Sequence, residues 1–263
     1  MTGLADTGLD LRNDDSFLGT SSGARVALHL ACGSALDQLF EQQSKPVLGA
    51  PASSPMVDWP RIQREWTRAR EAGGGPEAIL RRVGSLALEV ASTRGEDRRS
   101  IVASQLPVQT WPEKSLAMVA VNVETGERRA FDQHSSLELV DAVMATTAFW
   151  GSPPVFFEGH HYIDGGFYSS DNADLAIGFD QVIIFTLRPP LPSLSLASIE
   201  EGKKSLSRTG SRVEVVYPDR ACQEALAAGA PTNPAVRAPV AKAGRAQGRR
   251  LAKKICRFRD DSR

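Results

Sequence analysis

Residues 16–30 read SFLGTSSGARVALHL and contain a G-x-S-x-G pattern at Gly19-Thr20-Ser21-Ser22-Gly23. The apolar pair Phe17-Leu18 precedes the pattern, and a segment with helical spacing of its apolar residues begins at Ala24. A strand, a tight turn and a helix in this order expose a serine hydroxyl at a helix N-terminus, and the two glycines relieve crowding in the turn. Ser21 is therefore either a nucleophile on a strand-to-helix turn or a serine that caps a helix.

Strands and helices alternate along the rest of the chain. The patterns predict strands at 16–20, 116–123, 128–131, 162–163, 181–187 and 212–217. They predict helices at 24–40, 59–71, 76–91, 137–147 and 242–259, and a helical turn at 173–178. This alternation indicates an α/β fold with a mostly parallel sheet.

Composition is that of a globular protein, since 41% of the 263 residues are hydrophobic and 24% are charged. The length fits one large domain. No apolar run is long enough to span a membrane, and the first fifteen residues lack the pattern of a secretory signal. Three widely spaced cysteines without a C-x-x-C pattern indicate free thiols, so we expect a cytoplasmic protein.

The formal net charge of zero conceals an asymmetry between the two ends of the chain. Residues 237–263 carry ten Lys or Arg against two Asp, a net charge of +8, so residues 1–236 carry −8. We therefore divide the chain into a domain at 1–236 and a basic helical tail at 237–263. Phe258 is the one aromatic residue of this tail, which argues against a nucleic-acid partner.

Leu251, Ala252, Ile255 and Phe258 share one face of the tail if it is helical. Two interpretations remain open. The helix packs this apolar stripe against the core, or it lies peripherally on an anionic membrane surface.

The histidines offer a poor base for Ser21. His29 falls inside a predicted helix, His134 in a polar loop, and His160-His161 at a hairpin tip. The chain order serine, acid, histidine would pair His160 or His161 with Asp132 or Asp141, and neither acid follows a strand.

A carboxylate is the alternative base. Asp164 follows a short strand in Tyr162-Ile163-Asp164-Gly165-Gly166, where the glycines let the backbone approach another element closely. Such a stretch is also a good turn sequence. Burial near Phe149, Phe156, Phe157 and Tyr162 would raise the pKa of a carboxyl group toward the working pH.

Two motifs together resemble the patatin-like phospholipases. Gly19-Thr20-Ser21-Ser22-Gly23-Ala24 is similar to their G-T-S-A-G-A turn, and Asp164-Gly165-Gly166 to their D-G-G/A motif. The intervening VAVNVETGERRAF, DAVMATTAF and SPPVFFEGHHYIDGG follow in the family's order, and the likeness extends over about residues 4–250. The resemblance implies a three-layer α/β sandwich.

The resemblance also implies an activity, namely hydrolysis of lipid acyl esters of the phospholipase A type. Ser21 would be the nucleophile, Asp164 the base of a Ser-Asp dyad without histidine, and the Ser22 N–H one oxyanion donor. The chemistry requires no cofactor, and we expect no metal because no ligand spacing indicates one.

The chain departs from the family pattern in three places, one of which is Thr147–Trp150, where the family more usually has a small-residue and Pro-rich loop. Position 22 is Ser where the family usually has Ala. No stretch before the turn at residues 19–23 resembles the family's glycine-rich G-G-G-x-R/K-G oxyanion loop. Gly3 and Gly8 are isolated there, and Arg12 is the one arginine. We therefore expect an N-terminally truncated patatin-like domain that lacks the first strand, and a longer reading frame that carries the missing part.

A domain without this loop would be weakly active or inactive as a hydrolase. The alternative is a non-catalytic remnant of the fold with a binding or regulatory role.

Overall fold

The computed structural model describes residues 1–45, 58–90, 96–187, 194–227 and 234–261. Its main sheet has the order β1-β2-β5-β4, with β3 also paired to β2, and β6 and β7 form a second sheet. The strands are β1 (Ser16–Thr20), β2 (Ser115–Asn122), β3 (Arg128–Phe131), β4 (Val155–Phe157), β5 (His160–Asp164), β6 (Gln181–Phe185) and β7 (Arg212–Val216).

Helices occupy most of the remaining described chain. They are α1 (Thr2–Ala5), α2 (Ser22–Ala31), α3 (Leu36–Ser44), α4 (Trp59–Glu71), α5 (Pro76–Val90), α6 (Glu96–Ser104), α7 (Leu139–Thr146), α8 (Ile199–Arg208), α9 (Arg220–Ala227) and α10 (Arg237–Asp260). Short 3-10 turns lie at η1 (Leu11–Asn13), η2 (Gly165–Phe167), η3 (Ala173–Ala176) and η4 (Pro234–Val236). Among the described residues, no helix combines the length and the hydropathy needed to cross a bilayer.

The α/β class is confirmed, but the main sheet is mixed and not mostly parallel as we expected. β1 pairs with β2 in parallel, whereas β3 and β5 pair with β2, and β4 with β5, in antiparallel orientation. Short turns explain the β2–β3 and β4–β5 pairs, because a few residues connect only antiparallel neighbours. One such turn is Glu158-Gly159 between β4 and β5, where both residues have positive φ, 49° and 82°.

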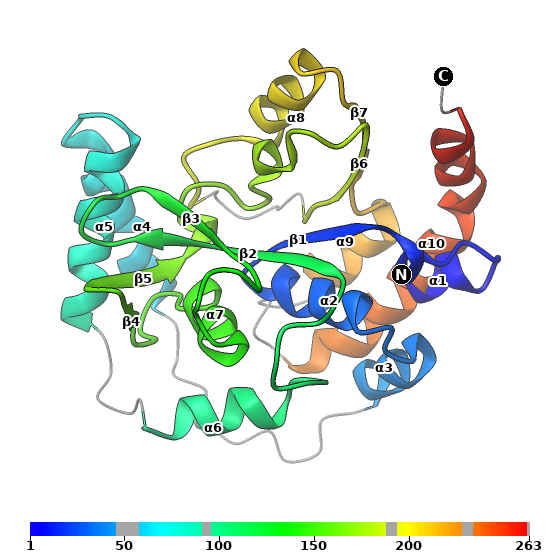
Figure 1. Ribbon diagram of the computed structural model, residues 1–263, viewed down its shortest axis with the longest axis horizontal. Coiled ribbons are helices and arrows are strands. Elements are labelled where there is room, and N and C mark those ends of the chain that lie inside the picture. The colour runs from blue at the N-terminus through cyan, green and yellow to red at the C-terminus, as the bar shows by residue number, and fades with distance from the viewer. Residues whose placement is uncertain (46–57, 91–95, 188–193, 228–233, 262–263) are drawn as a thin grey trace.

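Helices cover both faces of the main sheet. Met118 and Ala120 of β2 belong to a buried cluster with residues of α2 and α7, including Leu28. Val121 and the neighbouring strand residue Ile163 belong to a second cluster with α4 and α5. Because side chains alternate between the two faces of a strand, β2 is the shared middle of a three-layer arrangement (Figure 1).

The single helix predicted at 24–40 is wrong, because the chain forms α2 and α3 there instead. Gly33 has φ +64°, and its N–H donates to the Leu30 carbonyl at 3.0 Å. The N–H of Ser34 donates to the His29 carbonyl at 2.9 Å. This pair of bonds is a Schellman motif, which ends α2 at a residue that glycine favours.

Helix α10 confirms the helix predicted at 242–259 and packs beside α1 (Figure 1). Ala252 and Ile255 are buried in a cluster with Leu4 and Leu9, and Leu251 packs against it. The apolar stripe of the tail therefore faces the body of the protein.

Glycines bring α1 and α10 into backbone contact. A Cβ atom placed on Gly3 would lie 1.9 Å from the Arg245 carbonyl oxygen, and one on Gly248 would lie 3.0 Å from the Gly3 backbone. Ion pairs surround this contact. They join Arg245 to Asp6 and Asp37, Arg249 to Asp6, Arg250 to Asp219, Lys254 to Glu214, and Arg259 to Asp14.

We predict that Gly3→Ala lowers the free energy of unfolding by about 1–3 kcal/mol, because the added methyl group forces the two helices apart. Gly244→Ala is the matched control, since a Cβ at Gly244 of α10 meets nothing within 4 Å. That control should be neutral or stabilise by up to about 1 kcal/mol through helix propensity. Urea denaturation measures both, and equal effects of the two substitutions would contradict the close helix contact.

Candidate active site

Ser21 lies between the last residue of β1 and the first residue of α2, with φ 54° and ψ −130°. This backbone conformation is strained for a residue with a side chain and is typical of a nucleophile elbow. Gly19 is required by space, because its Cβ would lie 2.3 Å from the Ala24 Cα. Gly23 is not, since a Cβ there would meet nothing within 4 Å. The second glycine of the pattern therefore does not relieve crowding, contrary to our expectation.

A hydroxyl group from α7 holds the elbow in place. The Ser21 N–H donates to Thr146 Oγ1 at 3.0 Å, and the Thr146 hydroxyl donates to the Val119 carbonyl at 2.6 Å. Thr146 is completely buried. The strained backbone of Ser21 is thus bonded through one side chain to the central strand. Our sequence reasoning missed Thr146, since its partners are far away along the chain.

Asp164 ends β5 on the opposite side of β2. In the strand register, Thr20 pairs with Val119 and Asp164 pairs with Ala120. Ser21 follows Thr20 and therefore lies beside Ala120 on the β1 side of β2. Asp164 lies beside the same residue on the β5 side. The structure therefore brings the two predicted dyad residues to the same level of the sheet.

The Asp164 carboxyl group is buried, with 2% of the residue exposed. Its Oδ1 accepts the Gly166 N–H at 2.8 Å, and its Oδ2 is buried without a hydrogen-bond partner. Burial raises the pKa of Asp164 to about 6, opposed by the nearby Ser21 hydroxyl, the Gly166 N–H and the Arg98 guanidinium. No hydrogen bond of normal geometry joins Ser21 to Asp164, which is common in substrate-free sites.

The two glycines after Asp164 have different surroundings. A Cβ on Gly165 would lie 2.4 Å from the Val119 carbonyl oxygen, so a side chain there would push the turn away from β2. A Cβ on Gly166 would lie 2.9 Å from Asp164 Oδ1. Gly165 thus sets the distance of the turn from the sheet, and Gly166 leaves room for the carboxylate that its own N–H binds.

Asn172 links the elbow to this turn. Its side-chain amide donates to Thr20 Oγ1 at 3.0 Å, to the Ser169 carbonyl at 2.8 Å and to the Gly165 carbonyl at 3.3 Å. Asn172 is fully buried and has φ 47°, a conformation that asparagine adopts more readily than most residues.

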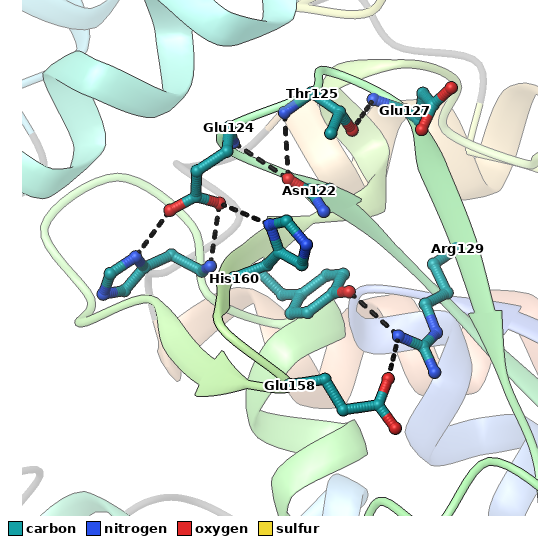
Figure 2. Close-up of polar contacts among 9 residues, drawn as sticks. Asn122, Glu124, Thr125, Glu127, Arg129, Glu158 and His160 are labelled. Carbon is teal, nitrogen blue, oxygen red and sulfur yellow. Dashed lines mark hydrogen bonds and ion pairs between the residues drawn. The ribbon is translucent and has the colours of Figure 1, made fainter.

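All four histidines lie beside polar groups other than Ser21, and His134 Nε2 is 3.2 Å from Gln133 Nε2. His161 Nδ1 lies 2.7 Å from Glu124 Oε1, and His160 Nδ1 lies 3.8 Å from Glu124 Oε2. Figure 2 shows His160 beside the Glu124 carboxylate. His29 Nδ1 lies 3.0 Å from Ser34 Oγ. No histidine is bonded to Ser21 in the described part of the chain, so the site presents a serine and a carboxylate.

The expected aromatic surroundings of Asp164 are present only in part. Tyr162 is buried, and Phe149 stacks on Phe167 at 5.2 Å between ring centroids. Phe156 is 64% exposed and packs on His161, so it does not shield the Asp164 carboxylate from solvent.

Two further features bear on the chemistry. Ser22 is the exposed first residue of α2, where backbone N–H groups have no partner within the helix and the helix dipole favours negative charge. Across the described ranges, no three or more His, Cys, Asp or Glu side chains are arranged to hold a metal ion.

Comparison with known proteins gives one result. The family model described as patatin-like phospholipase matches residues 8–177, which is well over half of the chain and includes Ser21, Asp164 and Asn172. No curated protein matches the chain.

The raised pKa of Asp164 predicts a pH-dependent effect of Asp164→Asn on stability. A carboxyl group whose pKa is raised from 3.8 to about 6 costs the native state stability as pH rises through this window, and the full cost persists above it. The variant should therefore be more stable than wild type by up to about 3 kcal/mol at pH 8, and the difference should shrink toward pH 4.

Urea denaturation at several pH values measures this difference. Asp180→Asn is the control, because Asp180 is exposed. A difference that stays constant with pH would contradict the raised pKa.

Proposed function

The chain belongs to the patatin-like phospholipase family, and from that premise we propose that it is a serine acyl hydrolase acting on lipid acyl esters. In this proposal Ser21 is the nucleophile and Asp164 is the base. No histidine takes part.

One observation carries the proposal. A serine in a strained strand-to-helix turn and a buried carboxyl group with one free oxygen flank the same residue of a central strand. A helix cap needs neither the strain nor the carboxylate, and Ser21 makes no side-chain cap bond to α2. These facts favour the nucleophile over the capping interpretation.

The first half of the reaction follows from this placement. The Ser21 Oγ attacks the ester carbonyl carbon, and its proton passes to Asp164 Oδ2, which has no other hydrogen-bond partner. With a pKa of about 6, Asp164 is ionised at neutral pH and is more basic than an ordinary aspartate. Collapse of the tetrahedral adduct expels the alcohol, which takes this proton, and leaves acyl-Ser21.

The second half repeats these steps with water. The water oxygen attacks the acyl carbon while Asp164 accepts a proton from that water. The proton then passes from Asp164 to Ser21 Oγ as the fatty acid leaves. The Ser22 N–H at the start of α2 is the donor that we assign to the oxyanion. Because loss of one oxyanion donor costs about 10²- to 10³-fold in rate, we expect this N–H to contribute on that scale.

The cysteines support a reducing compartment for this activity. Cys32, Cys222 and Cys256 are all free thiols. We therefore place the protein in the cytoplasm.

We predict that Ser21→Ala reduces hydrolysis of p-nitrophenyl esters, butyrate to decanoate, to the background rate, because the acyl group has no other acceptor. Ser170→Ala is the matched control. Ser170 is an exposed serine six residues after Asp164, and its hydroxyl donates to Asp171. That variant should keep wild-type activity.

A fluorophosphonate probe tests the same assignment without turnover. It should label wild type and Ser170→Ala but not Ser21→Ala. Equal ester hydrolysis by wild type and Ser21→Ala would overturn the nucleophile. A folded wild type with neither hydrolysis nor labelling would favour a non-catalytic member of the fold with a binding role.

We further propose that the tail contacts anionic lipid peripherally through cations that its ion pairs leave available. Lys253 and Arg257 are exposed on α10, and neither forms an ion pair with another described residue. Lys253→Glu/Arg257→Glu should weaken co-sedimentation with phosphatidylglycerol vesicles, because anionic surfaces attract each cation by about 1 kcal/mol.

The control for that experiment makes the same charge change elsewhere. Lys204→Glu/Arg208→Glu alters two exposed residues of α8 and should leave vesicle binding as in wild type. Equal losses in the two double variants, or no binding by wild type, would refute lipid contact through α10.

A further inference from the structure

Arg98 of α6 forms hydrogen bonds to residues 144–153, which comprise the last turn of α7 and the segment after it. Its Nη2 donates to the carbonyls of Met144 and Thr147 and to Thr147 Oγ1, each at 3.1 Å, and its Nη1 donates to the Pro153 carbonyl at 3.4 Å. A guanidinium group suits this arrangement, because its donors form a rigid planar fork. The bonds also place a positive charge at the C-terminus of α7, where the helix dipole is negative.

Residues 144–153 are hydrogen-bonded to both Ser21 and Asp164. Thr146 accepts the Ser21 N–H at 3.0 Å, and the Ala148 carbonyl accepts the Asp164 N–H at 3.2 Å. These two residues immediately flank Thr147, to which Arg98 is bonded twice. A shift of this segment would therefore move the nucleophile and the base together.

We propose that Arg98 is a positioning residue for the Ser21–Asp164 dyad, acting through residues 144–153, and this rests on the proposed hydrolase function. Arg98 forms no ion pair with a carboxylate in the described chain, although its side chain is partly buried.

Its charge also acts on the base. Burial lowers the pKa of Arg98, the neighbouring charge of Arg25 on α2 lowers it further, and Asp164 opposes both. In turn Arg98 favours the ionised form of Asp164 and lowers its pKa against the effect of burial. Arg98 thus joins the Ser21 hydroxyl and the Gly166 N–H, which have larger effects, in favouring the ionised form of Asp164.

The adjacent Arg99 provides a matched control on the same helix. Arg99 is exposed and pairs with Glu138 and with Asp141, at 3.0 Å to the latter, at the beginning of α7. It touches neither the end of α7 nor the dyad in any described contact. Removing Arg99 therefore tests for a general effect of lost α6–α7 interactions.

The experiment compares Arg98→Met, Arg98→Lys and Arg99→Met by the pH dependence of kcat/KM, with thermal unfolding as a check on folding. The acid limb of wild type should follow Asp164, near pH 6. Arg98→Met should reduce kcat/KM roughly tenfold or more, as expected for a displaced dyad, and move the acid limb to higher pH. Arg98→Lys keeps the charge but loses the fork, so kcat/KM should fall while the limb stays in place.

Arg99→Met should retain the wild-type profile. The proposal is overturned if Arg98→Met and Arg99→Met have the same kcat/KM and the same acid limb. If Arg98→Met does not fold, Arg98→Lys decides, and an unchanged kcat/KM in that variant overturns the proposal.

A measurement independent of hydrolysis separates this inference from the proposed function. The carboxyl carbon of Asp164 is followed by carbon-13 NMR as pH changes, with Asp164→Asn identifying its signal. Its pKa should rise in Arg98→Met and stay unchanged in Arg99→Met, even if wild type hydrolyses no ester. An unchanged titration in Arg98→Met would overturn the role of Arg98, whereas absent Ser21-dependent hydrolysis would overturn the function alone.

Discussion

The geometry of the site depends on the backbone of β2 at Val119 and Ala120. The Val119 carbonyl accepts the Thr146 hydroxyl that holds Ser21, and it is the atom that excludes a side chain at Gly165. Ala120 is paired with Asp164. A shift of β2 by one residue would therefore exchange its two faces and separate Ser21 from Asp164 at the same time. Burial of both faces by helices makes such a shift costly, so the same core that stabilises the fold fixes the relative positions of Ser21 and Asp164.

Asp164 lies where the protein core opposes its ionisation, and in the proposed function this opposition makes it a useful base. An exposed aspartate would be ionised at neutral pH but too weakly basic to take a proton from a serine hydroxyl. Complete burial without a partner would keep the carboxyl group protonated and inactive. Asp164 lies between these limits, because one N–H, one hydroxyl group and the charge of Arg98 each recover part of the cost of burial. In the proposed function, a base tuned in this way would let a serine hydrolase site work without histidine.

The features that the sequence predicted correctly are local in the chain. The strand, turn and helix around Ser21 depend on neighbouring residues, as does the turn after Asp164. The helix predicted at 24–40 failed at Gly33, because apolar spacing continues across the break while the backbone turns. Thr146 and Arg98 could not be found in this way, since each acts on residues far from it in sequence. Only the strand register and the packing of α6 on α7 bring them to the site.

The charge asymmetry of the chain has a structural counterpart in how α10 is seated. Its arginines and lysines meet carboxylates from α1, α3, β7 and the loops before β1 and α9, so the excess of each sign is partly neutralised by the other. Exposed ion pairs of this kind contribute little stability individually. The buried Ile255 and the backbone contact between Gly3 and Gly248 show where α10 packs closely on the rest of the chain. The ion pairs favour the same orientation, because a rotated helix would lose them and would turn its apolar stripe away from Leu4 and Leu9.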